Sequence, residues 1–355
     1  MKSLRTFALI LSLFASALCT QAAVIAHDNA ALRYVGRFDK TDVAGPRCTW
    51  SASAFSFTVN GGSASVKLKD TGKNVWQVVV NGEPASVLTL EAGEKLYPVA
   101  TGLPLGTHTI ELVKRTEASF GATQILGVEI DDRATLLPPP ARPRRIEVIG
   151  DSISCGFGNE APNKEAKFSA ATENAWLAYG AVAARAVNAD YVCIAWSGKK
   201  LWPDNTIVSL YDRTAPSALN TKWDFATWTP DVVVINLGTN DFNAKTNPDE
   251  AGWVAAYVKF IQEIRVRYPK TAIYCTLGTM ISDWPGDRKP RTTILGYFDK
   301  ILTEANASGG IPVKLVDFGV QMQHHGIGAQ WHPSVKTHSL MAEKLVVAFK
   351  KDLGW

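Results

Sequence analysis

The pattern of apolar and polar positions changes character once along the chain. From residue 24 to about residue 137, short apolar runs alternate with turn signals, and no stretch has a helical period. Asn60-Gly61-Gly62 and Asn81-Gly82 are typical hairpin sequences. The expected strands are 33–38, 48–51, 54–59, 64–68, 75–80, 107–113 and 125–130. This spacing predicts an all-β sandwich of the jelly-roll type over residues 24–137.

A second pattern begins after residues 138–145, where Pro138-Pro139-Pro140 and Pro143 predict a stiff linker. From there on, apolar runs alternate with helical periods. The expected strands are 146–149, 191–196, 232–237, 272–277 and 313–318, and the expected helices are 173–187, 249–268, 292–307 and 334–353. Alternation of this kind predicts an α/β domain over residues 146–355, with a five-stranded parallel sheet between two layers of helices.

The N-terminus has the layout of a secretory signal peptide. Lys2 and Arg5 precede an apolar run over residues 7–18, and small residues follow at Ala22-Ala23. We therefore expect residues 1–23 to be removed and the protein to be secreted, to the cell exterior or the periplasm. No later apolar run is long enough to cross a bilayer, so no membrane span is expected. We also expect a monomer.

Charge and cysteine usage exclude several classes of function. The net charge is only +4, and Lys and Arg are scattered apart from Arg142-Pro-Arg-Arg145, so no nucleic-acid partner is expected. The cysteines of the mature chain are Cys48, Cys155, Cys193 and Cys275. They show neither C-x-x-C nor a Cys/His metal spacing, which predicts no metal, no cofactor and at most one disulfide.

A serine follows the first strand of the α/β domain. Residues 146–149 end at Gly150-Asp151-Ser152, and ligands of open parallel sheets bind at the carboxyl ends of the strands. A helix that starts there directs free N–H groups at the ligand. Ser152 is therefore a candidate nucleophile, although an ordinary turn serine that caps a helix would look the same. We expect Asp151 to be a hydrogen-bond partner in the turn rather than a catalytic group.

The next two strands end in groups that could bind a negative oxygen. The second strand ends in Trp196-Ser197-Gly198-Lys199, and the third in Gly238-Thr239-Asn240-Asp241. A hydrolytic serine needs hydrogen-bond donors for the tetrahedral intermediate. The candidates for this oxyanion hole are the backbone N–H groups of Ser152 and Gly198 and the side-chain amide of Asn240. Glycine at 198 would allow a close approach.

The best candidate for a general base is His332, in Gln330-Trp331-His332-Pro333 just before the last helix. Alone it would more often be a plain loop histidine. The other histidines are His27 and His108 in the β-domain, His324 and His325 in a polar loop, and His338 inside the last helix. Only His332 is expected in a loop next to the sheet edge, where the other three segments also lie.

These segments resemble a known family. Gly150-Asp151-Ser152, Gly198, Gly238-Thr239-Asn240-Asp241 and His332-Pro333 stand in the order of the four sequence blocks of SGNH (GDSL) hydrolases. The resemblance covers residues 145–355. It implies a flavodoxin-like, three-layer fold and the activity of a serine esterase with Ser152 as nucleophile.

A narrower resemblance extends over nearly the whole mature chain. The N-terminal jelly roll, Leu210-Tyr211-Asp212-Arg213-Thr214, Trp223-Asp224-Phe225 and Trp331-His332-Pro333 are similar to carbohydrate esterase family 2. That family removes O-acetyl groups from plant polysaccharides such as xylan, mannan and glucomannan, with a preference for the sugar 6-OH. The resemblance thus implies an acetylated polysaccharide or oligosaccharide as substrate.

The sequence departs from the SGNH pattern at one point. Members of that superfamily usually carry an aspartate two or three residues before the histidine, where this chain has Gln330 and Ala329. Either a backbone carbonyl or the Gln330 amide oxygen orients the imidazole, or a distant acid such as Asp283 does so. Some members of the esterase family resemble the first arrangement, so we expect a Ser–His dyad.

Three aromatic residues are candidate sugar contacts: Trp331 beside the base, and Tyr211 and Trp284 in loops that follow strands of the sheet. For each of them, packing in the core is an equally good interpretation.

Two other functions fit parts of the sequence. An SGNH esterase could act on peptidoglycan O-acetyl groups, lipids or thioesters, but residues 282–288 form a polar loop with a single aromatic residue, unlike a lipase. A carbohydrate-binding protein without activity would fit the β-sandwich and the 11 tryptophans. It would not explain why Ser152, Gly198, Asn240 and His332 occur together.

Overall fold

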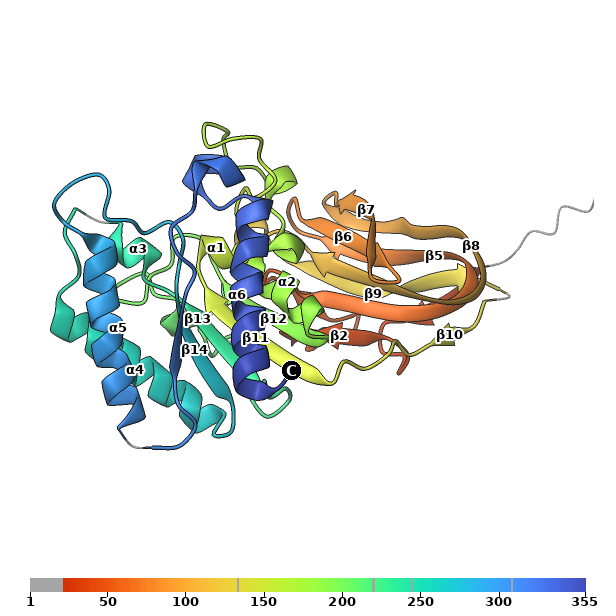
Figure 1. The fold of residues 1–355 in the computed structure, drawn as a ribbon. Coiled ribbons are helices and arrows are strands. Elements are labelled where there is room, and N and C mark those ends of the chain that lie inside the picture. Colours follow the sequence, from red (N-terminus) through yellow and green to blue (C-terminus); the bar gives the residue numbers. More distant parts are fainter. Residues whose placement is uncertain (1–21, 133, 219–220, 244, 308) are drawn as a thin grey trace, which may run out of the picture.

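The computed structural model describes residues 22–132, 134–218, 221–243, 245–307 and 309–355. Two β-sheets lie side by side, and helices cover the second (Figure 1). The predicted signal peptide lies outside the described residues, except for Ala22 and Ala23, which begin the first strand.

The first sheet is antiparallel and contains ten strands. They are β1 (Ala22–Ala26), β2 (Arg33–Val35), β3 (Phe38–Asp39), β4 (Arg47–Cys48), β5 (Ala54–Asp70), β6 (Val75–Val80), β7 (Glu83–Thr89), β8 (Gly93–Lys114), β9 (Thr123–Asp131) and β10 (Leu136–Leu137). The sheet curls around its own apolar core, which includes Phe55, Phe57, Trp76 and Leu112 (Figure 1). The predicted all-β sandwich domain is confirmed.

The two predicted hairpin sequences behave differently. Asn81-Gly82 joins β6 to β7 with Val80 opposite Glu83, and both turn residues have positive φ, 55° and 86°. Asn60-Gly61-Gly62 does not reverse the chain. It lies inside β5, which pairs with β8 on both sides of a register shift at Gly62. A bulge bends a strand without ending it, so the hairpin prediction was wrong there.

The second sheet is parallel, with the order β12-β11-β13-β14-β15. Its strands are β11 (Arg144–Gly150), β12 (Ala189–Ala195), β13 (Val232–Asn236), β14 (Ala272–Leu277) and β15 (Lys314–Asp317). This is the flavodoxin-like order, in which the chain switches direction at β11. The strand β11 starts at Arg144, inside the predicted linker, because Arg144 already pairs with Ala189 of β12.

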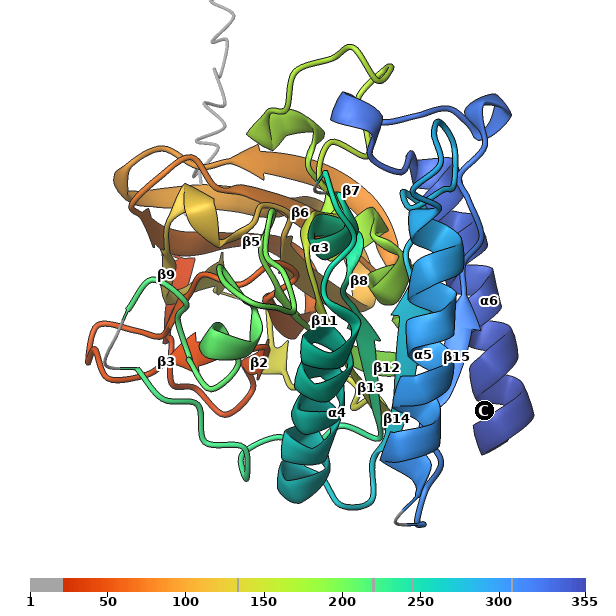
Figure 2. The ribbon, with the colours of Figure 1, turned by 90° about the vertical axis from the view of Figure 1, so that its left-hand side faces the viewer.

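Helices cover both faces of the parallel sheet: α2 and α6 on one, α4 and α5 on the other (Figures 1 and 2). Their bounds are α2 (Tyr179–Ala186), α4 (Glu250–Arg267), α5 (Pro290–Asn306) and α6 (Val335–Leu353). The predicted helix 173–187 is broken by a 3₁₀ turn, Ala175–Leu177. Two single-turn helices stand at the sheet edge. They are α1 (Ser152–Cys155), where the sequence suggested that a helix starts, and α3 (Thr239–Phe242), which was not predicted.

The two sheets share a continuous core. Val35, Trp50 and Val113 of the β-domain belong to the same buried cluster as the strands and helices of the α/β domain. A buried ion pair crosses the same interface, with Arg37 Nη2 3.4 Å from Glu147 Oε2. A buried pair of this kind needs both partners in place, so it fixes how the two parts sit against each other.

All four cysteines in the described part of the chain are buried and free. Burial raises the pKa of Cys48, Cys193 and Cys275 to about 12, so these thiols stay protonated. They act as small apolar groups of the core.

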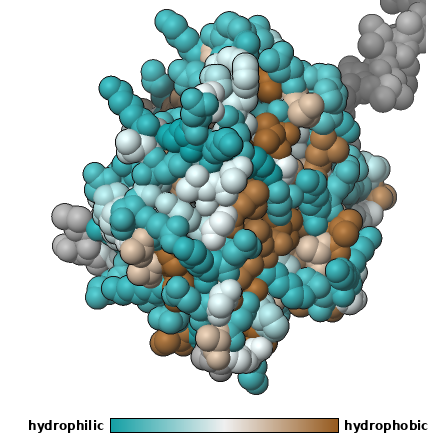
Figure 3. Space-filling view, turned by 60° about the vertical axis from the view of Figure 1, so that its left-hand side comes forward, coloured by the Kyte–Doolittle hydropathy of each residue, from teal (hydrophilic) through white to brown (hydrophobic). Residues whose placement is uncertain are grey.

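The face in Figure 3 is mostly hydrophilic, with a group of apolar residues near its centre and smaller apolar patches elsewhere. Among the described helices, none combines the length and the apolar character that a membrane crossing requires.

We predict that stability falls below about pH 6.5, partly because of His338. This side chain is fully buried, its Nδ1 accepts from Tyr179 N–H at 3.1 Å, and burial lowers its pKa to about 3. Between pH 6.5 and 3, the His338 imidazole therefore binds a proton in the unfolded chain but not in the folded chain. The free energy of unfolding should drop by up to about 1.4 kcal/mol per pH unit in this window.

Urea unfolding of the wild type and of His338→Asn at pH 7.5, 5.5 and 4.5 measures this effect. The Asn variant keeps an acceptor for Tyr179 but does not titrate, so its pH dependence should be weaker. Equal pH dependence in the two proteins would contradict the assignment.

Candidate active site

Ser152 stands at the carboxyl end of the central strand β11. The Asp151 side chain caps α1 by accepting from Ile153 N–H at 3.0 Å, which places Ser152 first in the helical turn. The chain turns so tightly here that a Cβ on Gly150 would lie 2.1 Å from Ser154 Oγ. Ser152 is only 6% exposed, yet it lines an open cleft.

His332 meets this serine from a loop 180 positions further along the chain. Its Nε2 lies 2.9 Å from Ser152 Oγ. The loop is anchored by Ala329 N–H, which donates to Gly158 O at 3.0 Å, and any Cβ on Gly158 would come within 2.4 Å of Ala329 Cβ. The ring of Phe157 packs against the imidazole, with 4.2 Å between centroids.

The other ring nitrogen of His332 faces backbone oxygens. Nδ1 lies 3.1 Å from Ala329 O and 3.2 Å from Gln330 O. Two successive residues with positive φ, Gln330 at 50° and Trp331 at 68°, shape this turn. Carbonyl oxygens only accept, so they favour the tautomer with hydrogen on Nδ1, which leaves the Nε2 lone pair for the Ser152 hydroxyl.

Burial lowers the pKa of His332, so the imidazole is neutral near pH 7. The distant acid considered above is engaged elsewhere. The Asp283 carboxylate accepts from the backbone N–H groups of Arg291 and Thr292 at 2.8 and 3.0 Å, at the start of α5.

Gly198 occupies the third position of a tight turn after β12. Lys199 N–H donates to Trp196 O at 3.2 Å, and Gly198 has a φ of 77°, which is the geometry of a type II turn. A Cβ at this position would meet nothing within 4 Å. The backbone conformation thus favours glycine here, and the close approach of an oxyanion to Gly198 stays a prediction.

Asn240 connects the segments that carry the predicted oxyanion donors. Its Nδ2 donates to Lys199 O at 2.9 Å and lies 3.3 Å from Asp151 Oδ2. Asn240 also lines the same cleft as Ser152 and His332. The structure therefore brings Ser152, Asn240 and His332 to one cleft, with the Gly198 turn hydrogen-bonded to Asn240 through Lys199.

Sequence reasoning did not give Asp241 a role. Its buried carboxylate accepts from Leu201 N–H, Trp202 N–H and Trp253 Nε1, so it holds the loop that follows Gly198. Burial raises the pKa of Asp241, and it raises the pKa of Asp151 to about 7. Asp241 was visible only as the last residue of a sequence block.

The cleft beside Ser152 has a volume of about 480 Å³. Its walls combine apolar groups with amide, hydroxyl and guanidinium groups. The lining residues are Ser152, Thr239, Asn240, Phe242, Asn243, Met280, Ile281, Ser282, Trp284, Pro285, Arg288, Pro290, Gln330 and His332.

The three predicted sugar contacts have different environments. Trp284 is 85% exposed and lines the cleft. Trp331 is half-exposed, and the Lys164 ammonium lies 3.9 Å above its ring. Tyr211 is buried, and its hydroxyl donates to Glu147 Oε1 at 2.5 Å. A side chain in that position cannot reach a substrate, so Tyr211 is corrected to a core residue.

Both parts of the chain match models of known families. Residues 34–140 match the N-terminal domain of carbohydrate esterase 2, and residues 148–340 match the GDSL-like lipase/acylhydrolase family. Over 334 residues the chain is 39% identical to the cellulase/esterase CelE of Acetivibrio thermocellus, a match that covers 92% of this chain and 40% of CelE. The chain thus spans less than half the length of that relative.

Two further comparisons cover nearly the whole of both partners. The chain is 30% identical over 325 residues to an acetylxylan esterase / glucomannan deacetylase of Cellvibrio japonicus, which covers 86% of each protein. It also superimposes with a TM-score of 0.86 and 39% identity on a family two carbohydrate esterase from Clostridium thermocellum in complex with cellohexaose, over 91% of this chain and 99% of that one. The chain therefore belongs to carbohydrate esterase family 2, with a GDSL-like hydrolase domain as its second half.

Proposed function

We propose that this esterase removes O-acetyl groups from plant cell-wall polysaccharides of the xylan and glucomannan type, by a dyad of Ser152 and His332. The observation that carries the proposal is the 2.9 Å contact between Ser152 Oγ and His332 Nε2 in an open cleft. The polysaccharide class comes from the similar proteins, one of which is named an acetylxylan esterase / glucomannan deacetylase.

The chemical sequence has two steps. His332 Nε2 takes the Ser152 proton as the serine oxygen attacks the acetyl carbonyl, and the imidazolium then protonates the departing sugar oxygen. Water, activated by the same imidazole, releases acetate from the acetyl-serine. In both steps the N–H groups of Ser152 and Gly198 and the amide of Asn240 bind the negative oxygen, each donor contributing roughly 3 kcal/mol of transition-state stabilisation. For this, Asn240 exchanges its longer bond, the 3.3 Å one to Asp151 Oδ2, for the oxyanion.

The imidazolium that forms is stabilised by carbonyl dipoles. Ala329 O and Gln330 O lie within 3.2 Å of Nδ1 and accept its hydrogen. They orient the ring as a carboxylate would but carry no full charge, so the dyad has a weaker electrostatic partner than a triad.

The cleft suits a short acyl group on a sugar. Its volume of about 480 Å³ accommodates one or two sugar rings, and the exposed ring of Trp284 offers a flat surface for stacking. Trp331, which directly precedes the base His332, offers a second surface for stacking. We infer that the acetyl group points to Ser152 while the sugar lies toward Trp284, and the family resemblance favours the 6-O position.

The substrate is a polymer outside the cell. A monomer exported by the segment 1–23 would reach it, and we propose this location and state for the protein.

The first prediction from the proposed function concerns the nucleophile. Ser152→Ala and His332→Ala should each lower the rate of acetate release from acetylated glucomannan or xylan by about 10³-fold or more. His324→Ala, which changes an exposed histidine of the neighbouring loop, is the matched control and should keep full activity. Acetate release at the wild-type rate from Ser152→Ala would sink the mechanism. Cleavage of long-chain esters in preference to acetylated polysaccharide would sink the substrate class.

The second prediction concerns pH. The base must be neutral, and its lowered pKa means that neutral imidazole persists below pH 6.5. The kcat/KM for 4-nitrophenyl acetate should therefore hold at pH 6.5 and fall only at lower pH. Asp283→Asn should leave this profile unchanged. A midpoint at pH 7 or above, or a large shift in Asp283→Asn, would indicate a base held by a carboxylate. Circular dichroism at each pH separates this effect from unfolding.

The third prediction concerns sugar stacking. Trp284→Ala should raise KM for an acetylated oligosaccharide about 3- to 10-fold, because a stacked ring contributes on the order of 1 kcal/mol. The kcat/KM for 4-nitrophenyl acetate, which has no sugar, should stay the same. An unchanged KM for the oligosaccharide would remove Trp284 from the binding surface.

A further inference from the structure

A glutamate of the β-domain reaches the edge of the parallel sheet. Glu117 follows the end of β8, in the part of the chain where the sequence showed no catalytic group. Its side chain is buried, and Oε2 accepts from the backbone N–H of Ser197 at 2.7 Å. Ser197 directly precedes Gly198, so a residue of one domain holds the turn that carries a predicted oxyanion donor in the other.

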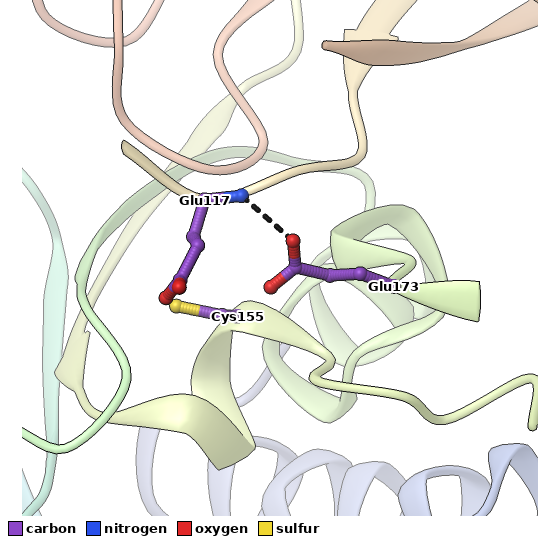
Figure 4. Close-up of side chains that lie close together, drawn as sticks. All are labelled: Glu117, Cys155 and Glu173. Carbon is purple, nitrogen blue, oxygen red and sulfur yellow. Dashed lines mark hydrogen bonds between the residues drawn. The ribbon is translucent and has the colours of Figure 1, made fainter. Parts of the chain in front are cut away.

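Both the side chain and the backbone of Glu117 are held by neighbouring groups. Ser119 Oγ donates to Oε1 at 2.8 Å, and the Lys114 ammonium donates to the Glu117 carbonyl oxygen at 3.1 Å. The backbone N–H of Glu117 donates to Glu173 Oε2 at 2.9 Å (Figure 4). Figure 4 also shows the Cys155 thiol against the Glu117 carboxylate. Cys155 ends α1, the turn that Ser152 begins, so Glu117 borders two segments of the active site.

Glu117 stands in a buried cluster with Cys155 and Glu173. Ligand atoms of Glu117, Cys155 and Glu173 lie within 4.8 Å of one another, and Glu173 Oε1 has no hydrogen-bond donor among the described residues. Burial, reinforced by the Glu117 charge, raises the pKa of Glu173 well above its usual range, so Glu173 is a neutral acid. Both oxygens of the Glu117 carboxylate accept hydrogen bonds from the chain, one from the Ser197 N–H and one from the Ser119 hydroxyl.

The other hydrogen bonds that hold the Gly198 turn are between neutral groups. Within it, Lys199 N–H donates to Trp196 O. From outside, Asn205 Nδ2 donates to Gly198 O at 3.1 Å and Asn240 Nδ2 donates to Lys199 O at 2.9 Å. Gly198 is exposed and no side chain packs over it. A charge-assisted bond to the Ser197 N–H is stronger than these neutral ones, and it fixes the peptide plane next to the one that contains the Gly198 N–H.

We propose that Glu117 is a positioning residue, which orients the Gly198 N–H toward the oxyanion by binding the N–H of Ser197. The proposal rests on the oxyanion role of Gly198 in the proposed function. The proposal gives the β-domain a part in catalysis, because Glu117 belongs to this domain and completes the oxyanion hole in the other. A small displacement of an oxyanion donor lowers the rate strongly, because the hydrogen bond from the donor to the oxyanion stabilises the transition state.

The test compares two conservative variants of Glu117, one that keeps the length of the side chain and one that keeps its charge. Glu117→Gln keeps the length, its amide oxygen can accept from Ser197, and its NH₂ can donate to Ser119 Oγ. Glu117→Asp keeps the charge but is shorter by one methylene, so it loses the bond to Ser197. Arg33→Gln is the control, because Arg33 forms another ion pair between the domains, with Asp190.

We expect kcat to fall on the order of 10- to 100-fold in Glu117→Asp and less than about 5-fold in Glu117→Gln and Arg33→Gln. KM should change little, and the loss should be equal for 4-nitrophenyl acetate and for acetylated oligosaccharide, since both form the same oxyanion. Any other order of the two Glu117 variants, including equal activities, overturns the proposal. The 4-nitrophenyl acetate assay needs no polysaccharide, so an error in the substrate class would leave this result interpretable. Circular dichroism and thermal unfolding of each variant accompany the kinetics.

Discussion

In the function that we propose, the chemistry depends on the hydrogen bond between Ser152 and His332. A serine hydroxyl is a poor nucleophile, and it becomes a good one only when a neutral imidazole stands within hydrogen-bond reach with its lone pair toward the hydroxyl. Here the lone pair is oriented from the opposite side of the ring, by Ala329 O and Gln330 O. In the proposed dyad, backbone carbonyl groups thus orient the imidazole, a role that an aspartate has in the usual SGNH pattern.

That backbone shape has a physical basis. Gln330 and Trp331 both have positive φ, which costs on the order of 1 kcal/mol or more at non-glycine residues. The conformation persists because the loop is tied to the nucleophile segment through Gly158, where no side chain would fit. The glutamate that we propose to orient the Gly198 turn follows the same principle, since a distant part of the chain fixes a local geometry at the site.

The sequence was informative wherever a local rule decides the outcome. Alternation of apolar runs and helical periods predicted the five parallel strands, and the blocks around Ser152, Asn240 and His332 predicted which residues meet at the sheet edge. Errors arose where tertiary context decides. Asn60-Gly61-Gly62 became a bulge because β5 continues to pair with β8 beyond it. Tyr211 became a core residue because Arg37 and Glu147, from other elements, form its surroundings. Glu117 could not be found at all, because only the packing of the two domains brings it to Ser197.

Covalent labelling tests the central claim most directly. A fluorophosphonate reacts with a serine only when a base has activated it and an oxyanion hole holds the phosphoryl oxygen. Peptide mass spectrometry of the labelled protein should find the adduct on Ser152 alone, with labelling slowed by orders of magnitude in His332→Ala. An adduct on another residue, or an equal labelling rate without the imidazole, would contradict the account.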